Sequence, residues 1–253
     1  MSKLPEANKF IDLSDYGRPA ARIIANSLKS TNFTPIHVTL LFIVSGLLGI
    51  ACILQGQYWL AAFFLILKSI LDAADGELAR VKDTPSYTGR FLDSVADILL
   101  NFLILLTVRY ITDTSWLMTL GAFISIQLQG TLYNYYYVIL RNKFNGDTTS
   151  RVYEKQAPKA FPIEKQRHVD ILFFLYNLLY RAFDKAIYLF DPKAEKEAKL
   201  PSWFMTIVSS FGLGFQLLTI GIMLVLGLIT SIIPLFIYLN VVMLGFILLR
   251  KSL

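Results

Sequence analysis

Cysteine and histidine are scarce in this 253-residue sequence, and their scarcity excludes several kinds of site. Cys52 is the only cysteine, so no disulfide can form within the chain. His37 and His168 are far apart in the sequence, which disfavours a His-rich metal site and a serine triad. The patterns G-x-S-x-G and G-x-x-x-x-G-K-S/T are absent. Serine-hydrolase and P-loop chemistry are therefore not predicted.

The N-terminus also lacks the features of a cleavable signal peptide. Residues 1–23 are polar and charged, with no short apolar core before a small-residue cleavage site. We therefore expect no removable leader.

Apolar residues, in contrast, are abundant. They make up 55% of the sequence, and the mean hydropathy is +0.54. Soluble domains are about 45–50% apolar even when glycine is counted. A run of about 18 or more apolar residues is typical of a transmembrane helix, and long apolar runs recur here at 36–54, 98–108, 115–128, 203–229 and 232–249. The sequence predicts an all-α integral membrane protein.

We predict six membrane-spanning helices, at 34–54, 58–81, 88–111, 115–140, 203–228 and 232–249. The second is the least obvious, because its apolar part, 58–71, is only about 21 Å long as a helix. That length falls short of the roughly 30 Å hydrocarbon core. Continuing the same helix through charged residues to Val81 gives about 36 Å. The charged segment is therefore predicted to end a span.

The distribution of basic residues predicts the orientation. Six spans place both termini and the connections 82–88 and 141–200 on one side, which carries nearly all the Lys and Arg. The positive-inside rule assigns that side to the cytoplasm. The segment 168–190 has only about ten apolar residues before charges interrupt it, so we predict an interfacial or core helix there and not a seventh span.

We divide the chain into two parts, 1–32 and 33–253. The first is a cytoplasmic segment, in which apolar residues at helical spacing over 13–30 predict an amphipathic helix on the membrane surface. The second is the six-span domain, with 141–200 as its cytoplasmic loop. The net charge of +6 suits anionic membrane lipids. Because topology explains the basic residues, no nucleic-acid partner is predicted.

The segment 71–100 carries the most unusual pattern of charge. On a helical wheel, five residues of the second span share one face: Asp72, Asp75, Gly76, Ala79 and Arg80. On the next helix Gly89, Asp93 and Asp97 recur every four residues. A short connection makes the two helices antiparallel neighbours. Two acidic stripes are therefore predicted to face each other beneath the cytoplasmic surface.

Four carboxylates packed together in a low dielectric cannot all stay ionised unaided. A divalent cation resolves the conflict, and hard oxygen ligands suit Mg²⁺ or Mn²⁺. Magnesium often keeps positions for substrate phosphates, and Arg80 can hold a phosphate or an aspartate. An alternative is a proton or cation path in a transporter. Nearby, Lys68 is predicted to snorkel or to pair with Asp72, and Glu77 to be a solvated or structural charge.

The same eight residues resemble the signature of the CDP-alcohol phosphatidyltransferases, D-x2-D-G-x2-A-R-x8-G-x3-D-x3-D. All eight positions, spanning 72–97, are filled at the correct spacing. The six-span layout and the amphipathic N-terminal helix are also similar to that family. One departure lies in "TPIHVT", where Ile36 takes the place of the asparagine of T-P-N-x-I/V-T/S in many members. We therefore expect the polar contact of that asparagine to be absent here.

The resemblance implies a role for each signature residue. Asp72, Asp75 and Asp93 would be metal ligands, shared between two divalent ions. Asp97 would be the general base on the acceptor hydroxyl, and it is a fourth candidate ligand. The residues that would line the cytidine diphosphate pocket are Gly76, Ala79, Arg80 and Gly89.

The resemblance also implies the reaction. A phosphatidyl group would move from CDP-diacylglycerol to an alcohol, such as inositol phosphate or glycerol phosphate, with release of CMP. The enzyme would be a homodimer in the plasma or inner membrane, with its active site at the cytoplasmic face. A rival within the family is transfer from CDP-choline or CDP-ethanolamine to diacylglycerol, and a rival outside it is the cation transporter.

Residues for the acceptor are less sharply indicated. Arg141, Lys143 and Arg151 are predicted to bind a phosphorylated acceptor, although positive-inside topology explains them equally well. Three polar residues are candidates for the pocket or for interhelical hydrogen bonds: Asn101, Gln127 and Gln129. Four tyrosines are predicted to form an interfacial belt: Tyr133, Tyr135, Tyr136 and Tyr137.

Overall fold

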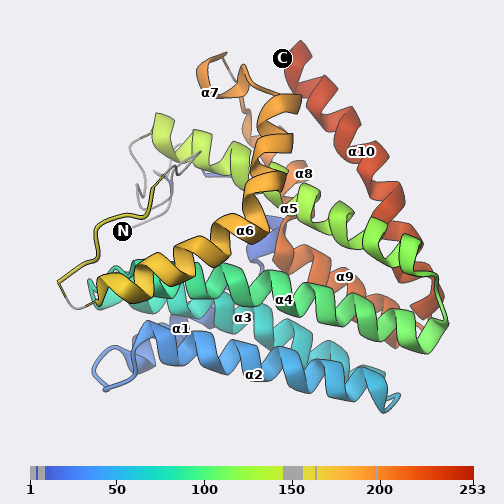
Figure 1. Cartoon of the computed structure of the whole chain (residues 1–253), viewed down its shortest axis with the longest axis horizontal. Helices are drawn as coiled ribbons and strands as arrows, with labels where there is room; N and C mark the ends of the chain where they lie inside the picture. Colours follow the sequence, from blue (N-terminus) through green and yellow to red (C-terminus); the bar gives the residue numbers. More distant parts are fainter. Residues whose placement is uncertain (1–3, 5–8, 145–155, 163, 198) are drawn as a thin grey trace.

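The computed structural model describes the chain apart from residues 1–3, 5–8, 145–155, 163 and 198, and the described part contains helices and no strand (Figure 1). The helices are α1 Arg18–Leu28, α2 Pro35–Leu54, α3 Tyr58–Val81, α4 Tyr87–Thr112, α5 Trp116–Lys143, α6 Gln166–Phe190, α7 Ala194–Glu197, α8 Ser202–Val208, α9 Leu213–Val225 and α10 Ile232–Ser252. Three short 3₁₀ turns complete the set, η2 Leu13–Asp15, η3 Ser209–Phe211 and η4 Ile229–Ser231. The all-α prediction is confirmed.

Side-chain caps fix where the long helices begin. Thr34 accepts a hydrogen bond from the backbone of His37, and His37 Nδ1 accepts one from the backbone of Thr34, so α2 starts with a reciprocal capping box. The Ser86 hydroxyl accepts from the Gly89 N–H at 2.8 Å at the start of α4. These caps satisfy backbone donors that the first helical turn leaves without partners.

The helix α3 has the bounds that the length argument predicted. It runs without a break from Tyr58 to Val81 and so carries the charged residues within its last three turns. It packs against α1, α2 and α9, and α4 packs against α2, α5 and α6. In Figure 1, α2, α3 and α4 run side by side along the long axis. The two helices that carry the acidic stripes therefore sit in the middle of the bundle.

The region 203–228, predicted as one span, is instead two helices bent by 54°. The backbone of Gly212 is extended between η3 and α9. Ser14 of η2 lies in this break, where its hydroxyl accepts a hydrogen bond from the Gly214 N–H at 3.0 Å. A side chain at Gly212 or Gly214 would collide with Ser14. The turn η2 therefore packs directly onto the backbone at the break.

Within the described residues, three segments are long and apolar enough to cross a membrane: Pro35–Leu54, Tyr87–Thr112 and Ile229–Ser252. The bent pair Ser202–Phe211 and Leu213–Val225 adds a fourth if it is one span. The polar residues of α3 and α5 prevent their identification by composition. Large apolar side chains such as Leu117 and Val241 are 82% and 71% exposed, as expected of a surface that faces lipid. The 25-residue α6 is not among the candidates either.

The N-terminal amphipathic helix is present as α1. Ala21 and Ala25 are completely buried against α3, whereas Ile23 is 69% exposed. The helix is shorter than the predicted 13–30, because residues 13–15 form η2 and Gly17 precedes the first turn. One apolar face thus packs on the bundle.

The segment before α6 is fastened to the start of α4. The Glu164 carboxylate accepts hydrogen bonds from the Ser86 hydroxyl at 2.7 Å and from the backbone of Thr88 at 2.7 Å and of Tyr87 at 3.2 Å. The Phe161 ring stacks on Tyr87, with centroids 4.7 Å apart. Burial opposes ionisation, but the donated hydrogen bonds prevail and lower the pKa of Glu164. An ionised Glu164 therefore caps α4 from a distant part of the chain.

Replacing Glu164 with Ala should loosen the first turn of α4. We expect the amides of Tyr87 and Thr88 to exchange hydrogen about fivefold faster, since a lost cap costs about 1 kcal/mol. A carboxyl group with a lowered folded pKa stabilises above its unfolded pKa, which is ordinarily 4.5 for Glu. The difference in exchange rate between Glu164→Ala and the wild type should therefore be largest at pH 7. It should shrink as the pH falls below 4.5 through the pKa of Glu164 in the folded protein. Hydrogen exchange read by mass spectrometry measures both.

The matched control is Glu195→Ala, on the exposed surface of α7. It should leave the exchange of Tyr87 and Thr88 unchanged. Equal exchange in Glu164→Ala and the wild type would contradict the capping role.

Candidate active site

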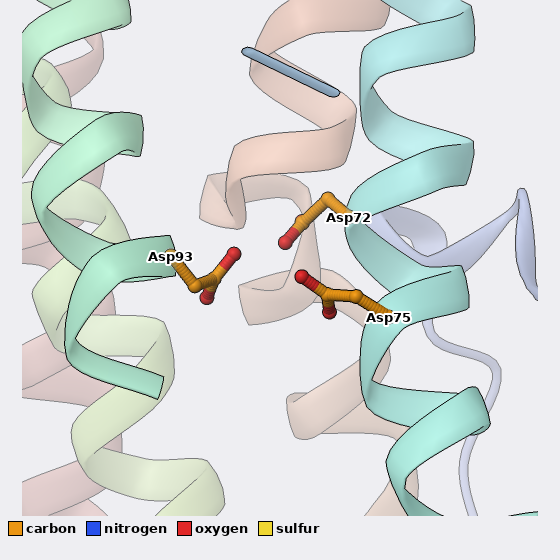
Figure 2. A group of neighbouring side chains, drawn as sticks. All are labelled: Asp72, Asp75 and Asp93. Atoms are coloured by element: carbon orange, nitrogen blue, oxygen red, sulfur yellow. The ribbon is translucent and has the colours of Figure 1, made fainter. Parts of the chain in front are cut away.

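Three carboxylates meet between α3 and α4. Figure 2 shows Asp72 and Asp75 on successive turns of α3 pointing toward Asp93 on α4. One oxygen from each lies within 4.8 Å of the others. The predicted acidic stripes therefore do face each other, and the structure brings together three of the four aspartates as one group.

The chemistry of this acidic triad, Asp72, Asp75 and Asp93, fits a divalent cation. Asp93 Oδ1 is buried and has no hydrogen-bond partner among the described residues. Asp75 is 9% exposed, and its Oδ2 accepts from the Thr39 hydroxyl at 2.6 Å. Hard carboxylate oxygens with like charge and an unsatisfied acceptor are the donor set that Mg²⁺ and Mn²⁺ take. The residues present can therefore hold the metal that the sequence predicts.

The fourth aspartate, Asp97, has a different partner. Lys68 is completely buried, and its Nζ donates to Asp97 Oδ1 at 2.5 Å. The same ammonium lies 4.9 Å from the centre of the Phe42 ring. Both predictions for Lys68, snorkelling and pairing with Asp72, are wrong.

The pairing follows from the antiparallel register. Lys68 precedes Asp72 on α3 by four residues, and Asp97 follows Asp93 on α4 by four. Both side chains therefore lie one helical turn deeper than the triad, at the same level of the bundle. An unpaired charge at that depth would be costly, so each stabilises the other.

A second set of charges lies on the other side of the triad. Glu77, 8% exposed, forms ion pairs with Arg18, with Arg80 at 3.3 Å and with Arg22 at 3.7 Å. Of the two roles foreseen for Glu77, the structural one is confirmed and the solvated one is wrong. The pair with Arg18 also joins α1 to α3.

The triad and Asp97 open into a pocket of about 410 Å³. Gly76 and Arg80 line it, and the Arg80 guanidinium lies alongside Gly76, 3.6 Å from where a side chain would begin. Ala79 and Gly89 are not part of the described lining. Gly89 instead donates its N–H to the cap of α4. Six of the eight signature residues thus meet at one cavity.

The structure places some of the predicted acceptor-binding residues at the pocket and others away from it. Arg141 lines the pocket, with its guanidinium 5.4 Å from the centre of the Tyr137 ring. Lys143 is not in the described lining, and Arg151 lies outside the described residues. Asn101 and Gln127 line the pocket, whereas Gln129 donates to the Phe236 carbonyl of α10 at 2.9 Å. Gln129 is therefore an interhelical partner.

The prediction that the four tyrosines of α5 form an interfacial belt is wrong. Tyr135 and Tyr136 are buried and donate to the carbonyl and the carboxylate of Asp191, and that carboxylate is also paired with Arg250. Tyr133 and Tyr137 line the pocket, and the Tyr133 hydroxyl donates to Asp12. The spacing of four from Tyr133 through Tyr137 to Arg141 is the signal that could have revealed this face.

Several pocket residues lie outside every predicted site. The N-terminal segment and α1 contribute Asp12, Ser14, Asp15 and Arg18, and α6 contributes Tyr176, Tyr180 and Asp184. Their sequence neighbourhoods contain no recognisable motif, because the pocket draws on segments far apart in the chain. The acidic triad thus forms one wall of a larger polar cavity.

The described part of the chain is a helical bundle with apolar helices and an acidic pocket that fits a divalent metal, a kind of site that can bind phosphate compounds in a membrane protein. The family model for CDP-alcohol phosphatidyltransferases matches residues 32–249. The chain belongs to this family. Membership supports the transfer of a phosphatidyl group from a CDP-alcohol to an acceptor in phospholipid biosynthesis. The family is membrane-bound and uses divalent metal ions. Comparison with curated proteins gave no significant match.

Removing the ammonium from the buried pair should destabilise the protein. We expect Lys68→Met to cost about 3 kcal/mol of unfolding free energy, because it leaves Asp97 buried without its partner. The double variant Lys68→Met with Asp97→Asn should regain much of that loss. Chemical denaturation in detergent micelles measures both. Single and double variants of equal stability would contradict the pairing.

Proposed function

We propose that this protein transfers the phosphatidyl group of CDP-diacylglycerol to a small polar alcohol and releases CMP. The observation that carries the proposal is the acidic triad in the wall of a polar pocket, bordered by Gly76 and Arg80 in the family's signature spacing. Asp72, Asp75 and Asp93 would hold one or two divalent cations, which when bound neutralise the pyrophosphate and the leaving CMP.

The proposal includes a six-span arrangement with both termini in the cytoplasm. Besides the four candidate segments, α3 and α5 are 24 and 28 residues long, about 36 and 42 Å as helices. Both lie within the bundle beside apolar helices, so their polar residues face protein and pocket. The lipid donor then enters sideways from the membrane, and the polar alcohol arrives from the cytoplasm. The plasma or inner membrane and a homodimer belong to the same proposal.

The C-terminal end of α3 would bind the donor. Gly76 leaves space beside the Arg80 guanidinium, which can donate to phosphate oxygens. Glu77 holds Arg80 from the other side and so limits its freedom. Diacylglycerol chains would remain in the bilayer while the pyrophosphate lies against the triad.

Asp97 would activate the acceptor. Its Oδ1 is held by Lys68, which leaves Oδ2 to accept the proton of the incoming hydroxyl. The acceptor oxygen attacks the phosphorus that bears the diacylglycerol, the bond from that phosphorus to CMP breaks, and the proton stays on Asp97. Lys68 fixes the direction of the carboxylate, which a general base requires.

Purified protein should release CMP from CDP-diacylglycerol only with Mn²⁺ or Mg²⁺ and a suitable alcohol. The panel is serine, glycerol 3-phosphate, myo-inositol and inositol 1-phosphate, with the lipid product identified by mass. Turnover only with CDP-choline or CDP-ethanolamine plus diacylglycerol would replace the proposal with that reaction. No CMP release, with metal-ion flux in vesicles, would replace it with transport.

In the same assay Asp97→Asn should lower turnover by about 10²–10⁴-fold, the usual contribution of a general base. The variant leaves the Lys68 ammonium without its charged partner and should lose about 3 kcal/mol of unfolding free energy. Because the triad is intact, the folded variant should still bind Mn²⁺, and turnover is compared per Mn²⁺-binding protein. Asp113→Asn, just beyond the other end of α4, is the matched control and should keep full activity. Near wild-type turnover of Asp97→Asn would show that another group takes the proton.

A further inference from the structure

The helix α6 contributes to the pocket although it lies outside the signature. Tyr176, Tyr180 and Asp184 recur every four residues, so they form one stripe along the helix. All three line the pocket. On another face Phe174 and Leu178 are 65% and 68% exposed. The helix is therefore two-sided, with a polar stripe turned to the cavity.

This stripe is held in place along α4. At the start of α4, Glu164 caps the first turn. The Phe91 ring then contacts Phe173 and Tyr176, with centroids 5.4 and 5.3 Å apart. Farther along, the Tyr180 hydroxyl donates to the Ser94 carbonyl at 2.9 Å. Three separate contacts fix α6 against the helix that carries Asp93 and Asp97.

The position of the stripe distinguishes it from the donor side. Gly76 and Arg80 belong to α3, whereas α6 packs against α4 and α5. Ser94 lies between Asp93 and Asp97 in the sequence, so Tyr180 reaches α4 at the level of these carboxylates. The single hydrogen of the Tyr180 hydroxyl is donated to Ser94, so Tyr180 holds α6 beside the acceptor-activating end of the pocket.

We propose that α6 forms the acceptor side of the pocket, where Asp184 selects a small alcohol with several hydroxyl groups and Tyr180 positions the wall. This inference rests on the function proposed above and names what that function leaves open. An aspartate accepts hydrogen bonds from hydroxyl groups, and the Tyr176 and Tyr180 rings, stacked with centroids 5.1 Å apart, offer a flat surface.

Steady-state kinetics test the assignment with the alcohol of the panel that turns over fastest. Asp184→Asn should raise the KM for that alcohol about tenfold, the loss expected for a hydrogen bond to a charged group. Tyr180→Phe should raise the same KM, because it frees the wall from Ser94. The KM for CDP-diacylglycerol should change less than about twofold in both variants, a split that a general loss of structure would not give.

The matched controls lie on exposed positions of the same helix, Asp170→Asn and Tyr188→Phe, and should behave as the wild type. An unchanged KM for the alcohol in Asp184→Asn, or an equal rise in both KM values, would overturn the α6 assignment alone. Turnover with serine only, which has one hydroxyl group, would overturn the choice of a polyol. If the wild type releases no CMP with any alcohol, the proposed function fails, and this inference fails with it.

Discussion

Like charges gathered inside an apolar bundle are the constraint on which the rest of this structure depends. Three aspartates within 4.8 Å repel one another, and their partial burial between helices screens that repulsion less than bulk water would. The protein compensates at three levels of α3. Lys68 pairs with Asp97 below the triad, a divalent cation fits at the triad, and arginines surround Glu77 above it. Lys68 and Glu77 are nine residues apart, about 14 Å along the helix.

The elements around the bundle follow from the same constraint. Arg18 joins α1 to Glu77, and η2 reaches into the break between α8 and α9, where the N-terminal Ser14 meets Gly214. The helix α6 closes another side through Glu164 and Tyr180. Segments from the N-terminal region, from α3 to α6 and from the start of α9 therefore converge on one cavity. The polar groups that line it are held by protein contacts, and the apolar residues of the same helices are left to face lipid.

Much of the fold could be predicted because helix length and apolar content are local properties. The bounds of α3 followed from the thickness of a bilayer, and the facing of Asp72, Asp75 and Asp93 followed from helical spacing and a short turn. The break at Gly212 could not be predicted, since the hydropathy of 203–228 is continuous and the residue that occupies the break lies about 200 positions away. No local pattern shows which backbone a distant serine will contact.

The partners of Lys68 and of the four tyrosines escaped prediction for a related reason. A helical wheel treats one helix at a time, so it offered Lys68 only the neighbour four residues on, whereas its true partner stands on α4. The tyrosines of α5 resemble an interfacial belt in sequence, but Asp12 and Asp191, from two other segments, accept hydrogen bonds from three of their hydroxyl groups. Polar contacts between helices depend on the register of the bundle, which the sequence of one helix does not contain.

The central claim is that the acidic triad binds a divalent cation. Mn²⁺ binding to the detergent-solubilised protein, followed by electron paramagnetic resonance, tests it without any substrate. The account predicts saturable binding to the wild type that Asp93→Asn weakens by more than about tenfold, since even outer-shell partners of metal ligands contribute 10–100-fold. Asp83→Asn, an exposed aspartate in the turn between α3 and α4, should bind as the wild type does. Equal Mn²⁺ affinity in the wild type and Asp93→Asn would contradict the claim.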